Sequence, residues 1–170
     1  MEIIPPKWTF LALYSVSILY YSIPMKNKDL KSAHILLVED NEGDIVLTLE
    51  AFEESKAKTE VSVVRNGREA LEFLYKKGKY QNVKKPDLIL LDINIPIFNG
   101  HEVLQLIKED SDLKRIPVVM LTTSSSHTDI QRAYDNHSNS YIMKSLDMEE
   151  FFEAIVKIEE FWFQVATLAD

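Results

Sequence analysis

The sequence predicts an α/β fold: a doubly wound sheet of five parallel strands with helices on both faces. Two observations carry this prediction. Five short apolar runs occur between residues 34 and 143, and a segment with helical apolar spacing follows each of them. Continuous apolar runs of this length are typical of strands that helices cover on both faces. Strict alternation of strands and helices is typical of parallel sheets.

The elements follow in order from these patterns. The runs expected to form strands are 34–38, 61–64, 88–91, 117–122 and 141–143. The helices are expected at 42–55, 66–77, 100–109 and 124–135, with a last one after Asp147. Asn66, Asp147 and the hydroxyls of residues 124–126 are of the types that cap helix N-termini. The last helix places apolar side chains toward the core at Phe151, Phe152, Ile155, Ile158 and either Phe161 or Trp162.

Composition excludes several classes. The chain has 170 residues, enough for one domain with a substantial core. It has no cysteine, which excludes disulfides, thiol nucleophiles and cysteine zinc sites, and which fits a reducing compartment. The formal charge is −8, from 19 basic and 27 acidic residues. We expect no nucleic-acid partner, because phosphate contacts need a basic face.

Residues 1–30 are predicted to form a hydrophobic extension ahead of a domain at 31–170. Residues 8–23 carry no charge and lie between Pro6 and Pro24, but a spanning helix needs about 20 apolar residues. Three interpretations compete: a membrane anchor that leaves the domain in the cytoplasm, an extra helix on the domain, or an over-extended start with translation beginning at Met25. We favour the third, so membrane contact is expected only if 8–23 is an anchor.

Polar residues end the predicted strands. Glu39 and Asp40 follow the first strand, Asp92 follows the third, Thr122 ends the fourth and Lys144 follows the fifth. Each has an ordinary structural interpretation taken singly, such as a helix cap or a turn residue. The carboxyl ends of parallel strands lie at one edge of the sheet, however, and crowded carboxylates repel one another unless a cation compensates.

Mg²⁺ suits such oxygen ligands, and it usually takes one or two carboxylates together with phosphate oxygens. A carboxylate can also be a nucleophile that forms an aspartyl phosphate. A hydroxyl and an ammonium group could then hold the phosphoryl oxygens. The strand ends therefore predict a site for a metal ion and a phosphoryl group.

Four motifs resemble those of the receiver domain of two-component response regulators: ILLVEDN at 35–41, LILLDINIPIFNG at 88–100, VVMLTTSS at 118–125 and YIMK at 141–144. The resemblance covers residues 33–165 and implies a flavodoxin-like sheet of order 2-1-3-4-5. The long loop before Asp87 and the ending EEFWFQVATL at 159–168 are most similar to single-domain regulators that are paired with bacteriophytochrome-type sensor kinases.

The resemblance also implies roles. Asp92 matches the phospho-accepting aspartate. Asp40 matches a direct Mg²⁺ ligand, Glu39 a ligand acting through water, and Asn94 the position whose backbone carbonyl completes the metal site together with Asp92. The remaining matches concern the switch: Thr122 is expected to move to the phosphoryl group, Lys144 to pair with Asp92 and then with the phosphate, and Tyr141 to turn inward.

Two positions depart from the family pattern. Ser145 stands where a proline, often preceded by a cis bond, usually follows the lysine, so the bond before it is free to be trans. His137 stands where glycine usually follows the fourth helix. If that position needs a positive φ, His137 is strained, unless Asn136 takes the turn instead.

The implied function is that of a cytoplasmic phosphoprotein, which catalyses only its own phosphorylation and dephosphorylation. A sensor histidine kinase would supply the phosphoryl group. We expect no attached output domain, so the signal would pass by protein contact or by phosphorelay to an unknown partner. Three consecutive aromatics at 161–163 cannot all face one way, which favours an exposed patch for homodimerisation or kinase docking.

Three alternatives belong to other classes. A degenerate receiver would be an interaction module insensitive to phosphate. A flavodoxin-like cofactor protein shares the topology, but the loop VEDNEGD at 38–44 would repel a flavin phosphate. A haloacid-dehalogenase-type phosphatase needs a second aspartate two residues after the first, where this chain has Asn94.

Overall fold

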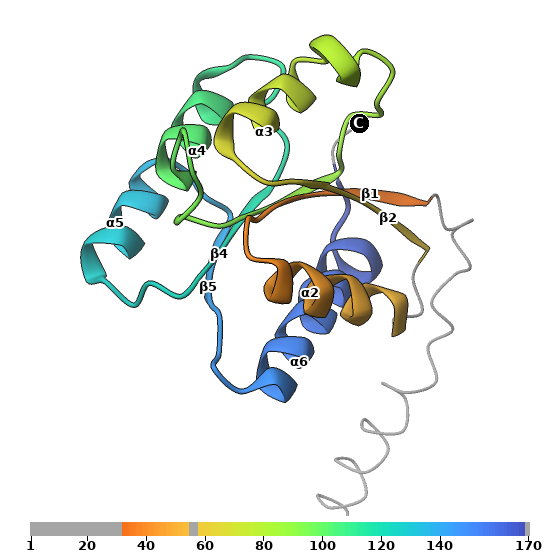
Figure 1. The fold of residues 1–170 in the computed structure, drawn as a ribbon, viewed down its shortest axis with the longest axis vertical. Coiled ribbons are helices and arrows are strands. Elements are labelled where there is room, and N and C mark those ends of the chain that lie inside the picture. Colours follow the sequence, from red (N-terminus) through yellow and green to blue (C-terminus); the bar gives the residue numbers. More distant parts are fainter. Residues whose placement is uncertain (1–31, 55–57, 169–170) are drawn as a thin grey trace, which may run out of the picture. The chain divides into compact units, whose positions relative to one another are not determined.

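The computed structural model describes residues 32–54 and 58–168. It contains one sheet and a set of helices that alternate with its strands along the chain (Figure 1). The strands are β1 (Ala33–Val38), β2 (Thr59–Val64), β3 (Leu88–Leu91), β4 (Val118–Thr122) and β5 (Ser140–Met143). The helices are α2 (Glu42–Glu54), α3 (Gly67–Leu74), α4 (Gly100–Glu109), α5 (His127–Asp135) and α6 (Met148–Glu159), with 3₁₀ helix η1 (Gly78–Tyr80) and π-helix η2 (Glu160–Val165).

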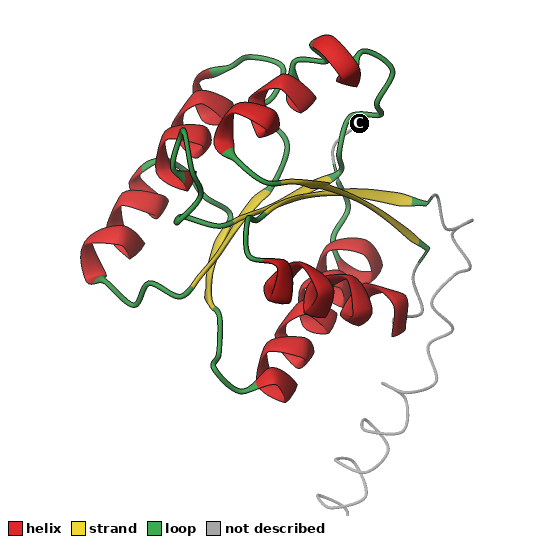
Figure 2. Ribbon diagram, viewed as in Figure 1, coloured by secondary structure: helices red, strands yellow, loops and turns green. Residues whose placement is uncertain are grey.

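The sheet has the order β2-β1-β3-β4-β5, and every pair is parallel. Helices α3, α4 and α5 cover one face, and α2 and α6 cover the other (Figures 1 and 2). This confirms the predicted fold class. In the register, Val38 of β1 lies beside Val64 of β2 and Leu91 of β3. The carboxyl ends of these strands therefore lie side by side.

Strand residues alternate between two cores. Leu36, Ile89 and Met120 face α3 and α4, whereas Ile35, Leu90 and Val119 face α2 and α6. Both sets are buried, which explains why the strands have no polar alternation in the sequence. The two cores hold the sheet rigidly between the helix layers, so loops at its carboxyl edge are well anchored.

The predicted helix boundaries differ from the structure by more than one residue at three places. Helix α5 begins at His127 rather than at residue 124, and Ser126, one of the expected cap hydroxyls, is its N-cap. The expected helix at 66–77 ends at Leu74, because Lys76 adopts a φ of 52° and turns the chain. The last helix continues from α6 into η2, whose wider turn leaves Phe161 exposed and packs Trp162 and Phe163 against the core. Trp162 rather than Phe161 is therefore the inward residue.

The expected hydrophobic extension at 1–30 lies outside the described residues, so the interpretations of residues 8–23 stay predictions. Within residues 32–54 and 58–168, no helix has the length and hydropathy needed to cross a membrane.

Candidate functional site at the carboxyl ends of the strands

Three carboxylates meet at the edge of the sheet. Glu39 and Asp40 follow β1, and Asp92 follows β3, so the parallel pairing of these strands brings them together. One ligand oxygen from each lies within 4.8 Å of the others. Glu39 and Asp92 are buried, whereas Asp40 is exposed and opens the cluster to solvent. The predicted carboxylate cluster therefore exists as a group of hard oxygen donors.

Lys144 brings one positive charge to this cluster from the end of β5. Its side chain is only 5% exposed, and its Nζ contacts Glu39 Oε2 directly. The same Nζ lies 2.8 Å from Asp44 Oδ2 and 3.6 Å from Asp92 Oδ2. Three carboxylates thus lie around a single ammonium group, and Asp40 adds a fourth to the cluster, which leaves an excess of negative charge.

The pKa directions reflect burial together with the neighbouring charges. Burial raises the pKa of Glu39, and the neighbouring charge of Asp92 adds to this, although the hydrogen bond and charge of Lys144 oppose it. Burial acts to lower the pKa of Lys144, but its hydrogen bonds to Asp44 and Glu39 and the charge of Asp92 outweigh burial and raise it. A further cation would stabilise the ionised carboxylates.

This donor set fits a divalent cation. Carboxylate oxygens with one exposed side offer the hard ligands and the open positions that Mg²⁺ and similar ions use. Asn94 lies exposed in the loop that follows Asp92. Its backbone carbonyl is the one that we expect to complete the metal site. Its coordination stays a prediction.

The loop from Asp92 to Gly100 is tightly packed. Asp92 Oδ1 accepts a hydrogen bond from the Ile93 N–H at 2.8 Å, and Gly100 N–H donates to the Ile93 carbonyl at 2.9 Å. A Cβ added at Gly100 would lie 2.2 Å from the Asp92 carbonyl oxygen, and one at Gly67 would lie 2.2 Å from that of Phe98. Only glycine allows this close approach at both helix starts.

Thr122 and Tyr141 meet at Ser124, in the loop after β4. The Thr122 hydroxyl is fully buried and accepts a hydrogen bond from the Ser124 N–H at 3.2 Å. The half-buried Tyr141 hydroxyl donates to the Ser124 carbonyl at 2.8 Å. The two predicted switch residues are therefore linked through one loop residue.

Sequence reasoning missed a further contact of this loop. The Ser124 hydroxyl donates to Asp129 Oδ2 at 2.5 Å, and the buried His101 ring lies 3.3 Å from Asp129 Oδ1. It also missed Asp44, whose spacing of one helical turn from Asp40 was the only signal. A carboxylate in the first turn of a helix is explained by the helix dipole alone, which hid its contact with Lys144.

Both departures from the family pattern are resolved. No cis peptide bond occurs in residues 32–54 and 58–168, so the bond between Lys144 and Ser145 is trans. Lys144 still reaches the cluster, and the Ser145 hydroxyl accepts a hydrogen bond from the Asp147 N–H at 3.1 Å. His137 has a φ of 61°, whereas Asn136 has a φ of −87°. His137 itself therefore takes the left-handed turn.

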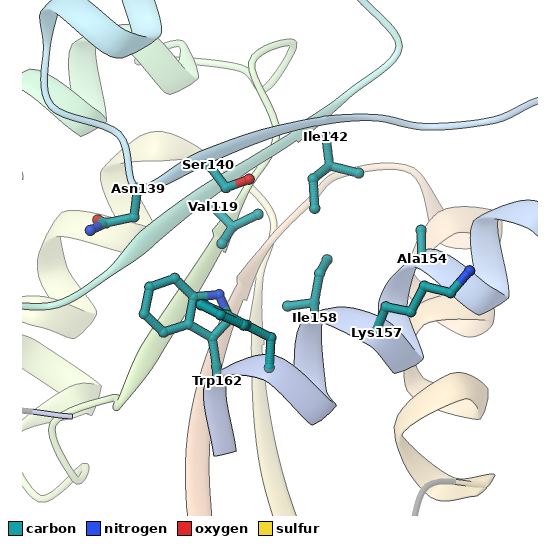
Figure 3. A pocket seen from close by; sticks show the side chains of 9 residues that line it. Val119, Asn139, Ser140, Ile142, Ala154, Lys157, Ile158 and Trp162 are labelled. Atoms are coloured by element: carbon teal, nitrogen blue, oxygen red, sulfur yellow. The ribbon is translucent and has the colours of Figure 1, made fainter. Parts of the chain in front are cut away.

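A separate apolar pocket of about 470 Å³ lies between β5 and the end of α6 (Figure 3). Ile142, Ile158 and Trp162 line it, and Lys157 lines it from α6 beside Ile158. Ser140, the first residue of β5, also lines it, whereas Lys144 follows the other end of this strand. No carboxylate is among its described lining residues, so the polar chemistry belongs to the strand-end site.

The fold and this site define a receiver domain. The model of the response regulator receiver domain family matches residues 35–156, and the chain belongs to this family. It is 44% identical over 134 residues to the response regulator Rcp1 of the cyanobacterium Synechocystis, an alignment that covers 79% of this chain and 91% of Rcp1.

Two solved structures show the same similarity. The phosphorylated cyanobacterial phytochrome response regulator RcpA is 48% identical with a TM-score of 0.80, over 82% of this chain and all of RcpA. The Mn²⁺-bound form of Rcp1 is 43% identical with a TM-score of 0.79, over 81% of this chain and 99% of Rcp1. The expected similarity to regulators of bacteriophytochrome-type systems is confirmed.

Proposed function

We propose that this chain is a phospho-accepting response regulator in which Asp92 takes the phosphoryl group of a sensor histidine kinase in a Mg²⁺-dependent reaction. One observation carries the proposal. The buried Asp92 carboxylate has an oxygen within 4.8 Å of ligand oxygens of Glu39 and Asp40, and its Oδ2 lies 3.6 Å from the Lys144 ammonium. A phosphoryl acceptor needs this combination of nucleophile, metal ligands and cation.

The residues divide the chemistry among them. A carboxylate oxygen of Asp92 forms the new bond to phosphorus while the bond between phosphorus and the kinase histidine nitrogen breaks. The Ile93 N–H holds Oδ1 in place, and Oδ2 faces Lys144 at 3.6 Å. Glu39, Asp40, Asp92 and the Asn94 carbonyl would hold Mg²⁺, which when bound supplies positive charge to the phosphoryl oxygens.

Thr122, Tyr141 and Lys144 would convert the phosphate into a change of surface. Phosphorylation adds roughly −1.5 to −2 charge at Asp92. Lys144 would follow this charge, and the Thr122 hydroxyl would exchange the Ser124 N–H for a phosphoryl oxygen. Tyr141 would then leave the Ser124 carbonyl and turn inward. The change is a shift of population between two arrangements of the β4–α5 loop and β5.

The partners follow from the relatives. Because RcpA is a phytochrome response regulator, we propose a bacteriophytochrome-type sensor histidine kinase as the phosphoryl donor and the cytoplasm as the compartment. Signalling would proceed by phosphorylation-dependent protein contact or by phosphorelay. The exposed Phe161 of η2 supports a homodimer contact at the end of α6. The centroids of the Phe161 and Trp162 rings are 5.2 Å apart, so the two side chains form one aromatic pair there.

The test is intact mass after incubation with Mg²⁺ and acetyl phosphate, beside Asp92→Asn. We expect one phosphoryl addition in the wild type only, lost when the metal is chelated. No addition to a folded wild-type protein would instead support the alternative, a degenerate receiver that acts as a phosphate-independent interaction module. Addition to Asp92→Asn would mean that another residue is the acceptor.

A further inference from the structure

Asp44 is the residue at this site that the proposed chemistry leaves without a role. Its Oδ2 lies 2.8 Å from Lys144 Nζ, closer than the 3.6 Å that separates Nζ from Asp92 Oδ2. The Lys144 side chain is almost fully buried, so each of its contacts replaces lost hydration. Asp44 is therefore a principal counter-ion of the lysine rather than a nearby surface charge.

The backbone holds Asp44 firmly. Its N–H donates to the Asn41 side-chain oxygen at 3.1 Å, and its carbonyl accepts from the Thr48 hydroxyl at 2.7 Å. The next N–H, of Ile45, donates to the Asn41 carbonyl at 3.0 Å. These bonds fix the first turn of α2, and they aim the Asp44 carboxylate at the strand ends.

The position of Asp44 separates it from the metal ligands. The carboxylates whose oxygens converge on one point are those of Glu39, Asp40 and Asp92, and Asp44 is not among them. Lys144 also contacts Glu39 and faces Asp92, so it competes with a bound cation for two of the three ligands. Asp44 is the carboxylate that can keep Lys144 neutralised without giving up a ligand.

We propose that Asp44 is a positioning residue for phosphoryl transfer, which holds the Lys144 ammonium so that Glu39 and Asp92 stay available to the cation. This inference rests on the proposed function, because it concerns the same site. Removing the Asp44 charge lets Lys144 pair more strongly with Glu39 and Asp92. The cation must then displace the lysine before it binds.

The test measures metal binding to the full chain without any phosphoryl donor. Electron paramagnetic resonance gives the affinity for Mn²⁺, and the shift of the thermal midpoint gives the affinity for Mg²⁺. We expect Asp44→Asn to bind about tenfold more weakly, at the lower end of the loss caused by removing an outer-shell partner. Asp44→Glu should restore much of the affinity. Thermal midpoints in chelator check that both variants fold.

Glu42→Gln is the matched control. Glu42 carries the same charge in the same helical turn, but it pairs with Arg65 at 2.7 Å. A general loss of negative charge would weaken metal binding equally in both variants, and that result would overturn the proposal. An unchanged affinity in Asp44→Asn would overturn it as well.

A double-mutant cycle tests the route of the effect. In a Lys144→Met background, Asp44→Asn should cause no further loss, because no ammonium group remains to be positioned. An equal loss in that background would contradict the proposal. These readouts need no phosphorylation, so a wild type that binds metal as expected but takes no phosphoryl group would disprove the proposed function and leave this cycle interpretable.

Discussion

At the scale of single residues, burial decides how the polar groups behave. Glu39 and Lys144 are almost completely removed from water, so each is stable as an ion only through its partner. Asp40 keeps its solvent exposure and offers the entry side for a cation. Burial raises the free energy of the unpaired charges at this site. It also strengthens their attraction to an opposite charge, because the dielectric constant is low there.

His101 gives a prediction of pH dependence. Burial and the charge of Arg132 lower its pKa, whereas Asp129 opposes them, and both of these charged groups lie on α5. The unfolded chain therefore binds a proton at a higher pH than the folded protein does. The contribution of neutral His101 to the free energy of unfolding is fully present above about pH 6.5. It is lost as the pH falls toward the lowered pKa of His101 in the folded protein.

Urea unfolding at about pH 7.5 and about pH 5.5 measures this loss. We expect His101→Leu to reduce the difference in unfolding free energy between the two conditions. His127→Gln, a change at an exposed histidine of α5, the helix that carries Arg132 and Asp129, is the control and should leave the difference as in the wild type. Equal pH dependence in the wild type and in His101→Leu would refute the assignment.

At the scale of elements, two glycines fix the loop that carries Asp92. Gly67 begins α3 and Gly100 begins α4, and both pack against backbone atoms of residues 92–98. Ile97 in this loop has a φ of 77°, and the Phe98 N–H donates to the Pro96 carbonyl at 3.1 Å across it. A β-branched residue with this φ is strained, so close packing must hold the turn.

Gly100→Ala should therefore destabilise the protein by about 1–3 kcal/mol or more, because the backbone must shift to admit a methyl group. Gly43→Ala in the first turn of α2 is the control. There the nearest atom to an added Cβ is the Asn41 side-chain oxygen at 3.2 Å, and alanine favours helix by up to about 1 kcal/mol. Urea unfolding of both variants checks the contrast, and equal effects would show that the close approach is not limiting.

Helices α3 and α5 end in the same C-terminal capping motif. After α5, the His137 N–H donates to the Tyr134 carbonyl at 2.9 Å and the Ser138 N–H to the Ala133 carbonyl at 3.0 Å. Lys76 and Lys77 repeat this pattern after α3. Both helices thus end in a Schellman motif, whose left-handed position normally carries glycine.

His137→Gly should stabilise the protein by up to about 1 kcal/mol, because the relief of a left-handed histidine outweighs the added freedom of the unfolded chain. His137→Ala, which loses the ring but keeps the strain, separates backbone from side-chain effects and should not stabilise. A lower thermal midpoint for His137→Gly than for wild type would mean that the imidazole makes a stabilising contact.

At the scale of the whole molecule, the parallel sheet gathers groups from distant parts of the chain. Lys144 and Glu39 are 105 residues apart, yet they meet because β5, β4, β3 and β1 all end at the same edge. Ser124 connects Thr122 and Tyr141 at this edge to Asp129 of α5, and Asp129 in turn lies 3.3 Å from His101 of α4. A charge added at Asp92 can therefore alter a surface formed by several elements.

Metal binding should accordingly stabilise the entire domain. At a Mg²⁺ concentration about 100 times its Kd, linkage gives about 2.7 kcal/mol, or roughly 5–10 °C in the thermal midpoint of a chain of this size. Chelation should remove this gain, and Asp40→Asn should lack it. In chelator the same variant should be at least as stable as wild type, because one repelling carboxylate is gone. A full Mg²⁺ gain in Asp40→Asn, with sodium chloride as the ionic-strength control, would place the metal elsewhere.

The amino-acid sequence by itself determined the alternation of strands and helices and the residues that end each strand. Apolar runs such as 35–38 and 88–91 report burial on both faces directly, because a strand between two helix layers has no room for polar side chains. Glu39, Asp40, Asp92, Thr122 and Lys144 stood out because each follows or ends such a run. The strand order came from the family resemblance rather than from the runs themselves.

Only the tertiary structure decided which side chains touch. Asp44 and Lys144 are 100 residues apart, and nothing in the first turn of α2 indicates that its carboxylate reaches across the sheet edge. The contact of His101 with Asp129, the early end of α3 at Leu74 and the inward position of Trp162 were hidden for the same reason. Sequence periodicity reports local burial, whereas contacts between distant side chains depend on the register of the strands and the packing of the helices upon them.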